Sequence, residues 1–196
     1  MIEYRLATSA DLKQVANIHK EQFPDHYLGQ FSTTILERFY ECLLDAGYIF
    51  VVAADEGQIL GFVLGGEWTR ISETLSRFMK NNFLRSLLES AIRPKTWKKS
   101  VQKFKGFFSS KVSDPKNLDN IERFTLLSIA TGKDAQGKGI GKGLVERFNI
   151  EMRKISTRYY LSVQDTNDRA IRLYHKLGFV DTYLCPGEIQ MIKTLE

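Results

Sequence analysis

Apolar residues recur along this chain with two different spacings. Runs rich in β-branched and aromatic residues predict strands at 2–7, 48–54, 58–66, 124–131, 179–184 and 188–195. Apolar residues three and four positions apart predict helices that end near 22 and 45, a helix after the glycines at 137–143, and a short helix at 167–177. Strands and helices mixed along one chain in this way predict an α/β (α+β) fold.

The run at 136–143 follows a predicted strand, opens a predicted helix, and contains glycine at every second position. Glycines let backbone N–H groups approach an anion closely. The first turn of a helix adds unpaired N–H donors and the positive end of the helix dipole. Lys138 and Lys142 add positive charge. The run therefore predicts a phosphate-binding loop.

Spacing excludes two common phosphate motifs. No register of these glycines supplies the G-x-G-x-x-G of dinucleotide-binding folds. The P-loop pattern nearly fits from Gly132 to Lys138, but Gly139 stands where a serine or threonine hydroxyl would hold magnesium. What remains is the short pattern Q-x-x-G-x-G.

A second segment, 167–179, follows at the distance that one helix and one strand would occupy. Asn167 is placed as the N-cap of a short helix, and Gly178 as its left-handed C-cap. The same residues also allow purely structural roles, with Asn167 as a plain cap and Tyr174 as a core tyrosine. One face of the helix is apolar and comprises Ala170, Leu173, Tyr174 and Leu177.

Taken in order, the two segments resemble the signatures of the GCN5-related N-acetyltransferase (GNAT) family. The resemblance implies a mixed, mostly antiparallel sheet of about six to seven strands flanked by helices, and acetyl-CoA as cosubstrate. It implies that Asn167 contacts the pantetheine arm, that Tyr174 is the general acid for the departing sulfur, and that backbone N–H groups at 129–131 stabilise the oxyanion. The implied cofactor-binding residues are Ile129, Ala130, Thr131, Gln136, Gly137, Lys138, Gly139, Ile140, Gly141, Lys142 and Asn167.

The general base is the weakest part of the resemblance. Protein N-terminal acetyltransferases of the family often carry a glutamate five positions before the asparagine, where this chain has Ser162. Glu122 is the candidate base, acting through water, unless the amine arrives neutral. An ion pair of Glu122 with a neighbouring cation explains that carboxylate equally well. Asp165 and Asp168 fit caps of the following helix better than a base.

The segment 68–118 departs from the family, in which the third and fourth strands are joined by a short link. It holds twelve Lys and Arg against three acidic residues, a balance of +9 in a chain whose net charge is +5. Its apolar periodicity predicts two amphipathic helices broken at Arg93 and Pro94. Three interpretations stay open: packing on the core, a lid that attracts an anionic acceptor, or docking on an anionic membrane surface or nucleic acid.

Composition sets the remaining expectations. With 196 residues and 43% hydrophobic content, the chain suits one domain over 1–196. It has no apolar run of about 18 residues, which favours a cytoplasmic protein. Two cysteines and three scattered histidines predict no metal site. The expected partners are acetyl-CoA and an amine acceptor, with a homodimer and contact with an anionic membrane left open and nucleic acid not favoured. The alternative function is a catalytically inactive acyl-CoA sensor or an interaction module that docks through the basic segment 68–118.

Overall fold

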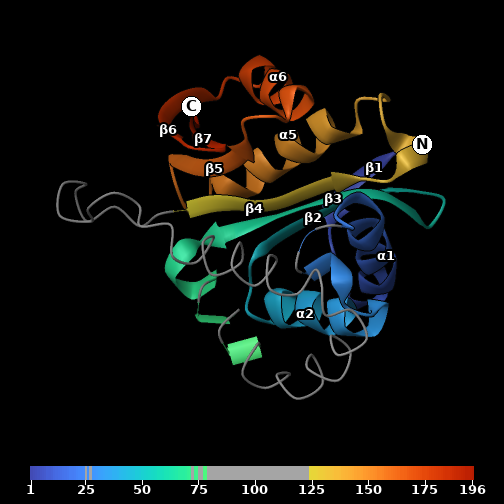
Figure 1. Cartoon of the computed structure of the whole chain (residues 1–196). Coiled ribbons are helices and arrows are strands. Elements are labelled where there is room, and N and C mark those ends of the chain that lie inside the picture. The colour runs from blue at the N-terminus through green and yellow to red at the C-terminus, as the bar shows by residue number, and fades with distance from the viewer. Residues whose placement is uncertain (25, 27, 72, 75–76, 79–123) are drawn as a thin grey trace.

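The computed structural model describes residues 1–196 apart from 25, 27, 72, 75–76 and 79–123 (Figure 1). In chain order the main elements are β1 Glu3–Leu6, α1 Leu12–Gln22, α2 Thr33–Asp45, β2 Ile49–Asp55, β3 Gln58–Glu67, β4 Phe124–Thr131, α5 Ile140–Met152, β5 Arg158–Gln164, α6 Asp168–Lys176, β6 Val180–Cys185 and β7 Glu188–Thr194.

The described strands form one seven-stranded sheet in the order β1-β2-β3-β4-β5-β7-β6. All neighbouring pairs are antiparallel except β4 and β5, which run parallel. The expected α/β class, with a mixed and mostly antiparallel sheet of six to seven strands, is confirmed.

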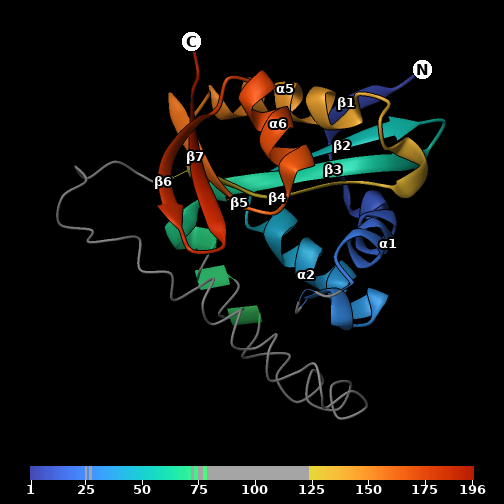
Figure 2. The ribbon, with the colours of Figure 1, turned by 45° about the horizontal axis from the view of Figure 1, so that its top comes forward.

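Helices cover both faces of this sheet, with α1 and α2 on one side and α5 and α6 on the other (Figures 1 and 2). Strand β2 is buried on both faces because its residues alternate between the two cores: Phe50 and Val52 pack toward α1 and α2, whereas Val51 and Ala53 pack toward α5. A strand buried on both faces has no polar alternation. The continuous apolar run in the sequence at 48–54 reflects this position.

Local signals in the sequence set the ends of several elements. Ser32 caps α2, because its Oγ accepts a hydrogen bond from the Ile35 N–H at 3.4 Å. Gly47 follows that helix with φ of 76°. Glu56 and Gly57 both have positive φ, 48° and 82°, at the turn that joins β2 to β3. Two consecutive positive φ values fit the two-residue turns that match strand twist, so the strands predicted at 48–54 and 58–66 form an antiparallel hairpin.

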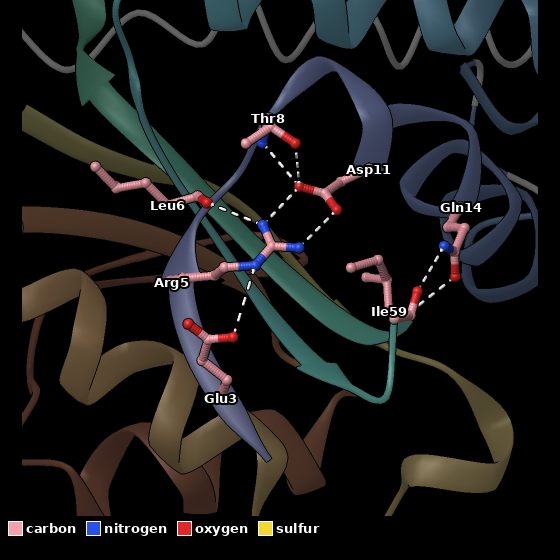
Figure 3. Close-up of polar contacts among 8 residues, drawn as sticks. Glu3, Arg5, Leu6, Thr8, Asp11, Gln14 and Ile59 are labelled. Carbon is pink, nitrogen blue, oxygen red and sulfur yellow. Dashed lines mark hydrogen bonds and ion pairs between the residues drawn. The ribbon is translucent and has the colours of Figure 1, made fainter. Parts of the chain in front are cut away.

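A charged cluster fixes the start of α1 against β1 (Figure 3). The Arg5 guanidinium donates to both carboxylate oxygens of Asp11, at 2.7 and 2.8 Å. The Thr8 N–H and hydroxyl donate to the same carboxylate, at 2.8 and 2.9 Å. The hydrogen bond from Arg5 is the main cause that lowers the pKa of Asp11, which is only 5% exposed. The Asp11 carboxylate therefore caps the backbone N–H of Thr8 where the chain enters this helical segment.

Replacing Asp11 by asparagine should lower the free energy of unfolding at pH 7 by ~2–3 kcal/mol, because the variant leaves Arg5 without its buried counter-charge. The lowered pKa means that this stabilisation is present above the unfolded-state pKa of Asp11 and is lost as pH falls through the folded-state pKa. The difference between the two proteins in urea denaturation should therefore begin to shrink as pH falls below ~4.

The matched control is Glu3→Gln, which removes a carboxylate that is 69% exposed and 4.0 Å from the Arg5 Nε. Exposed ion pairs contribute ~0–1 kcal/mol, so this change should be nearly silent. Equal losses for the two variants would show that the Asp11 carboxylate has no special role.

Only the start of the 68–118 segment is described. Residues 68–71 are helical, and Ile71 and Phe78 are buried in the core on the α1 and α2 side. The Phe78 ring lies 5.4 Å from that of Phe39 in α2. The start of the segment thus packs on the core, while the predicted break at Arg93 and Pro94 lies outside the described residues. No described helix has the length and apolar character to cross a membrane.

Candidate acetyl-transfer site

The glycine loop joins β4 to α5 through a single 3₁₀ turn, Lys133–Ala135. Gly137 and Gly139 have φ of 79° and 78°, in the left-handed region, and nothing lies within 4 Å of where a Cβ would stand at either residue. The first backbone hydrogen bond of α5 runs from the Gly143 N–H to the Gly139 carbonyl at 3.2 Å. The amides of Ile140, Gly141 and Lys142 precede it, so they have no carbonyl within the helix to bond.

Positive charge surrounds these amides. Lys138 is exposed, and Lys142 is exposed with its Nζ 3.7 Å from the Glu146 carboxylate. The N-terminal end of the helix dipole adds a positive partial charge. Together, open glycines, free amides and a positive field suit a phosphate group.

Strand β4 separates from β5 immediately beside this loop. The two strands are paired only at Thr125 and Tyr160 in the described structure. Beyond Thr125, backbone groups on the β5-facing edge of β4 have no strand partner. Residues 129–131 lie in this stretch and still pair with β3 on the other edge. The backbone expected to stabilise an oxyanion is thus free on one side.

A one-residue bulge in β4 precedes this stretch. Leu64 of β3 pairs with Ser128, but the next residue, Gly65, pairs with Leu126, so Leu127 has no partner in β3. Bulges bend a strand and change which side chains face each side of a sheet. As a result, Leu126 and Ile129, three positions apart, both pack toward α5.

Helix α6 lies against the start of α5 and brings the second signature to the loop. A Cβ built on Gly141 would stand 3.3 Å from the Leu173 side chain of α6. The Oδ1 of exposed Asn167 accepts from the Ala170 N–H at 3.2 Å, which confirms the predicted N-cap. The NH₂ group of the same amide remains able to donate to another acceptor. Gly178 has φ of 81°, as its predicted C-cap role requires.

Tyr174 is buried on the inner face of α6. It is 6% exposed, and its ring lies 5.4 Å from the Phe179 ring. Burial raises the pKa of Tyr174 to about 12, so the phenol keeps its proton at neutral pH. A protonated phenol can act as a hydrogen-bond donor or an acid.

The comparison with protein families supplies the deciding observation. The model of the Acetyltransferase (GNAT) family matches residues 12–179, which include the loop, the parted strands and α6. The chain belongs to the GNAT family. No match was found among curated proteins.

Solved structures with the same fold accord with GNAT membership. The yncA protein of Salmonella typhimurium, solved with its cofactor acetyl-CoA, is 18% identical with a TM-score of 0.63, covering 100% of this chain and 95% of that one. Ribosomal-protein-alanine N-acetyltransferase of Brucella melitensis is 18% identical at TM-score 0.62, covering 98% and 99%. Ard1 of Thermoplasma volcanium is 17% identical at TM-score 0.61, covering 100% and 98%.

One residue of the GNAT loop, Gln136, hydrogen-bonds to two other side chains of the protein. Gln136 donates from its Nε2 to the Gln22 Oε1 at 2.9 Å, and its Oε1 accepts from Arg169 at 2.7 Å. The Lys133 N–H also donates to Glu21 at 3.3 Å. Gln136 therefore ties the loop to the end of α1 and the start of α6. Sequence reasoning missed Gln22 and Arg169, which carry no motif of their own.

The expected base is not located among the described residues of this GNAT chain. Glu122 lies outside them. Ser162 is exposed on β5 opposite Gln190 of β7, and Asp165 and Asp168 are exposed near the start of α6. No group of three or more His, Cys, Asp or Glu side chains in the described structure could hold a metal ion.

Proposed function

We propose that this chain transfers the acetyl group of acetyl-CoA directly to a primary amine. The observation that carries the proposal is the start of α5, where amides without a carbonyl partner in the helix follow two left-handed glycines whose Cβ positions are open. Membership of the GNAT family supports the proposal, as does the acetyl-CoA bound to the yncA protein of the same fold.

The residues present fit three parts of acetyl-CoA: the pyrophosphate, the pantetheine arm and the thioester carbonyl. The amides of Ile140, Gly141 and Lys142 would hold the pyrophosphate, with Lys138 reinforcing the field. The free edge of β4 at 129–131 offers backbone groups to the pantetheine arm and the thioester carbonyl. When bound, acetyl-CoA supplies the acetyl group in activated thioester form.

The protein's own groups would stabilise charge, donate the proton and orient the cosubstrate during the transfer. Backbone N–H groups at 129–131 would donate to the carbonyl oxygen as negative charge develops there, which is worth several kcal/mol in comparable sites (~2.7–4 for one donor). Tyr174 would hold its proton toward the departing sulfur. The amide NH₂ of Asn167 would orient the pantetheine arm.

The acceptor is proposed only as a primary amine. Ser162 stands where a glutamate base would serve a protein N-terminal acetyltransferase, which disfavours that substrate class. The +9 balance of the 68–118 segment favours an acceptor that carries negative charge, such as a nucleotide-linked amino sugar or an acidic peptide.

Two measurements on the full chain test this function. Calorimetry should detect acetyl-CoA binding, and release of free thiol should follow when an amino sugar nucleotide, an acidic peptide, an alanine-terminated peptide or a polyamine is added. Absence of acetyl-CoA binding would refute the proposal. Binding without thiol release across the amines would instead favour the inactive acyl-CoA sensor.

A further inference from the structure

A row of side-chain hydrogen bonds joins the start of α6, the glycine loop and the end of α1. Arg169 donates from Nη1 to the Gln136 Oε1 at 2.7 Å, and Gln136 donates from Nε2 to the Gln22 Oε1 at 2.9 Å. Gln22 in turn donates from Nε2 to the Glu21 Oε2 at 3.2 Å. The Lys133 N–H donates to the same Glu21 oxygen at 3.3 Å. The row therefore leaves the loop at Gln136 and returns to it at Lys133.

The charged groups at its two ends fix the direction of this row. An arginine guanidinium can only donate and a carboxylate can only accept, whereas a glutamine side chain does both. The two glutamines between Arg169 and Glu21 therefore have one arrangement that satisfies every contact, with each amide oxygen toward Arg169 and each NH₂ toward Glu21. Hydrogen bonds to charged groups are also stronger than those between neutral ones. Glutamine suits position 136 because neither a carboxylate nor a lysine could donate and accept there at once.

The row contacts the part of the loop that its glycines leave without side chains. Gln136 directly precedes Gly137, and neither Gly137 nor Gly139 has anything within 4 Å of a built Cβ. Glycine has more backbone freedom than any other residue, so ordering this stretch is costly in conformational entropy. The Gln136 N–H bonds the Lys133 carbonyl at 3.2 Å, so both contacts with α1 act on one turn. These contacts therefore limit the conformations that the amides at 140–142 can adopt.

The other end of the row fixes the loop relative to α6. Arg169 lies in the first turn of α6, two residues after Asn167. The proposed function places the pyrophosphate on the loop and the pantetheine arm beside Asn167, and these are two parts of one ligand. Such a ligand binds best when both of its sites are already correctly placed. The hydrogen bond between Arg169 and Gln136 connects the two elements that carry these sites.

We propose that Gln22 and Arg169 are positioning residues for acetyl-CoA, which act through Gln136 to hold the loop in its binding conformation before acetyl-CoA binds. This inference rests on the proposed acetyl transfer. Neither side chain takes part in the transfer of the acetyl group or of a proton. Loss of either contact should raise the Kd for acetyl-CoA, because binding must then also order the loop. The kcat at saturating acetyl-CoA should change little, because the reacting groups are unaltered.

Calorimetric titration with acetyl-CoA on two single variants tests the inference. Gln22→Ala and Arg169→Ala should each raise the Kd about 3- to 10-fold, as expected for the loss of one or two hydrogen bonds, and leave kcat within about twofold. Arg169→Lys keeps a donor for the Gln136 oxygen and should recover most of the affinity. Gln22→Ala is the more telling variant, because an uncharged side chain on α1 adds nothing to the positive field around the phosphate.

Gln14→Ala is the matched control on the same helix. Gln14 donates to the Gly57 carbonyl at 3.1 Å and accepts from the Ile59 N–H at 2.9 Å, so it also joins α1 to a distant segment. These contacts reach the turn between β2 and β3 and the start of β3, not the glycine loop. Gln14→Ala and Gln22→Ala should lower the urea midpoint to a similar degree, but only Gln22→Ala should change the Kd for acetyl-CoA.

Hydrogen exchange in the unliganded protein gives a readout that needs no acetyl-CoA. Backbone amides of 133–143 should exchange faster in Gln22→Ala and Arg169→Ala than in wild type, and at the wild-type rate in Gln14→Ala. Coupling gives a second readout. Because Arg169 acts on the loop through Gln136, adding Arg169→Ala to Gln136→Ala should raise the Kd by less than about twofold further.

The outcomes separate this inference from the function beneath it. A wild-type chain that binds no acetyl-CoA refutes the proposed function and the positioning role with it. A wild-type chain that binds, with Gln22→Ala equally tight or with unchanged exchange at 133–143, refutes the positioning role alone. The same holds if Arg169→Ala weakens binding fully in the Gln136→Ala background, because the guanidinium would then contact acetyl-CoA directly.

Discussion

Replacement of Tyr174 by phenylalanine is expected to lower kcat for acetyl transfer by about 100-fold, while the Kd for acetyl-CoA changes by less than about twofold. This loss in kcat should lie at the lower end of the range for general acid catalysis, because burial raises the pKa of Tyr174 to about 12 and makes the phenol a weak acid. Steady-state kinetics and calorimetry on the two proteins measure the two quantities.

The pH dependence follows from the same pKa. Because the raised pKa of Tyr174 keeps the phenol protonated at every pH below it, this group should cause no fall in kcat between pH ~7 and ~10. A wild-type kcat that falls with an apparent pKa near 8 to 9, and a Tyr174→Phe enzyme that lacks this fall, would contradict the assignment.

Tyr159→Phe is the matched control, since it removes a hydroxyl from the same core cluster. The Tyr159 hydroxyl donates to the buried Asn149 side chain at 2.6 Å, a structural contact. Its loss should destabilise the fold by ~1–2 kcal/mol and leave kcat within about twofold. If both variants lost rate equally, the effect of Tyr174 would be one of packing.

Local chemistry made much of the fold predictable. Gly178 was predicted as the left-handed C-cap of the short helix at 167–177, and it follows α6 with φ of 81°. The ends of the predicted last strands, 179–184 and 188–195, lie within one residue of the ends of β6 and β7. The spacing of apolar residues and the residues that favour turns depend on short stretches of sequence. Helices, strands and turns can therefore be predicted without knowing what packs against them.

Contacts between distant elements could not be predicted in this way. Gln136 and Gln22 are 114 positions apart, and nothing in either segment indicates that their amides meet. The His19 Nδ1 and the Tyr40 hydroxyl lie 2.6 Å apart, yet both residues fall on the apolar faces of two predicted helices, where the pattern treats them as ordinary core residues. Which polar groups share a buried position depends on helix packing, and the sequence period does not encode it.

The bulge at Leu127 shows the same limit within one strand. An apolar run at 124–131 is compatible with a regular strand or a bulged one, because both keep the run buried. The position of the bulge depends on how β3 and β4 pair, and this pairing fixes the face of the sheet on which Ser128 and Ile129 lie. The faces on which these side chains lie could therefore be assigned only once the pairing was known.

Replacement of Gly139 by valine should weaken acetyl-CoA binding by about 100-fold, equivalent to ~2.7 kcal/mol. Gly139 has φ of 78° as the N-cap of α5, and a β-branched residue is strongly disfavoured in the left-handed region. The chain would relieve this strain by turning the loop, which would move the free amides of Ile140 and Gly141 away from a common point. Calorimetric titration with acetyl-CoA measures the loss.

Gly187→Val separates loss of the phosphate site from general backbone strain. Gly187 lies in the turn between β6 and β7 with φ of 88°, and, like Gly139, it has nothing within 4 Å of a built Cβ. Both valines should lower the urea midpoint similarly, because the strain of a left-handed residue is local. Only Gly139→Val should change the Kd for acetyl-CoA. An unchanged Kd in that variant would mean that the amides at the start of α5 do not hold the pyrophosphate.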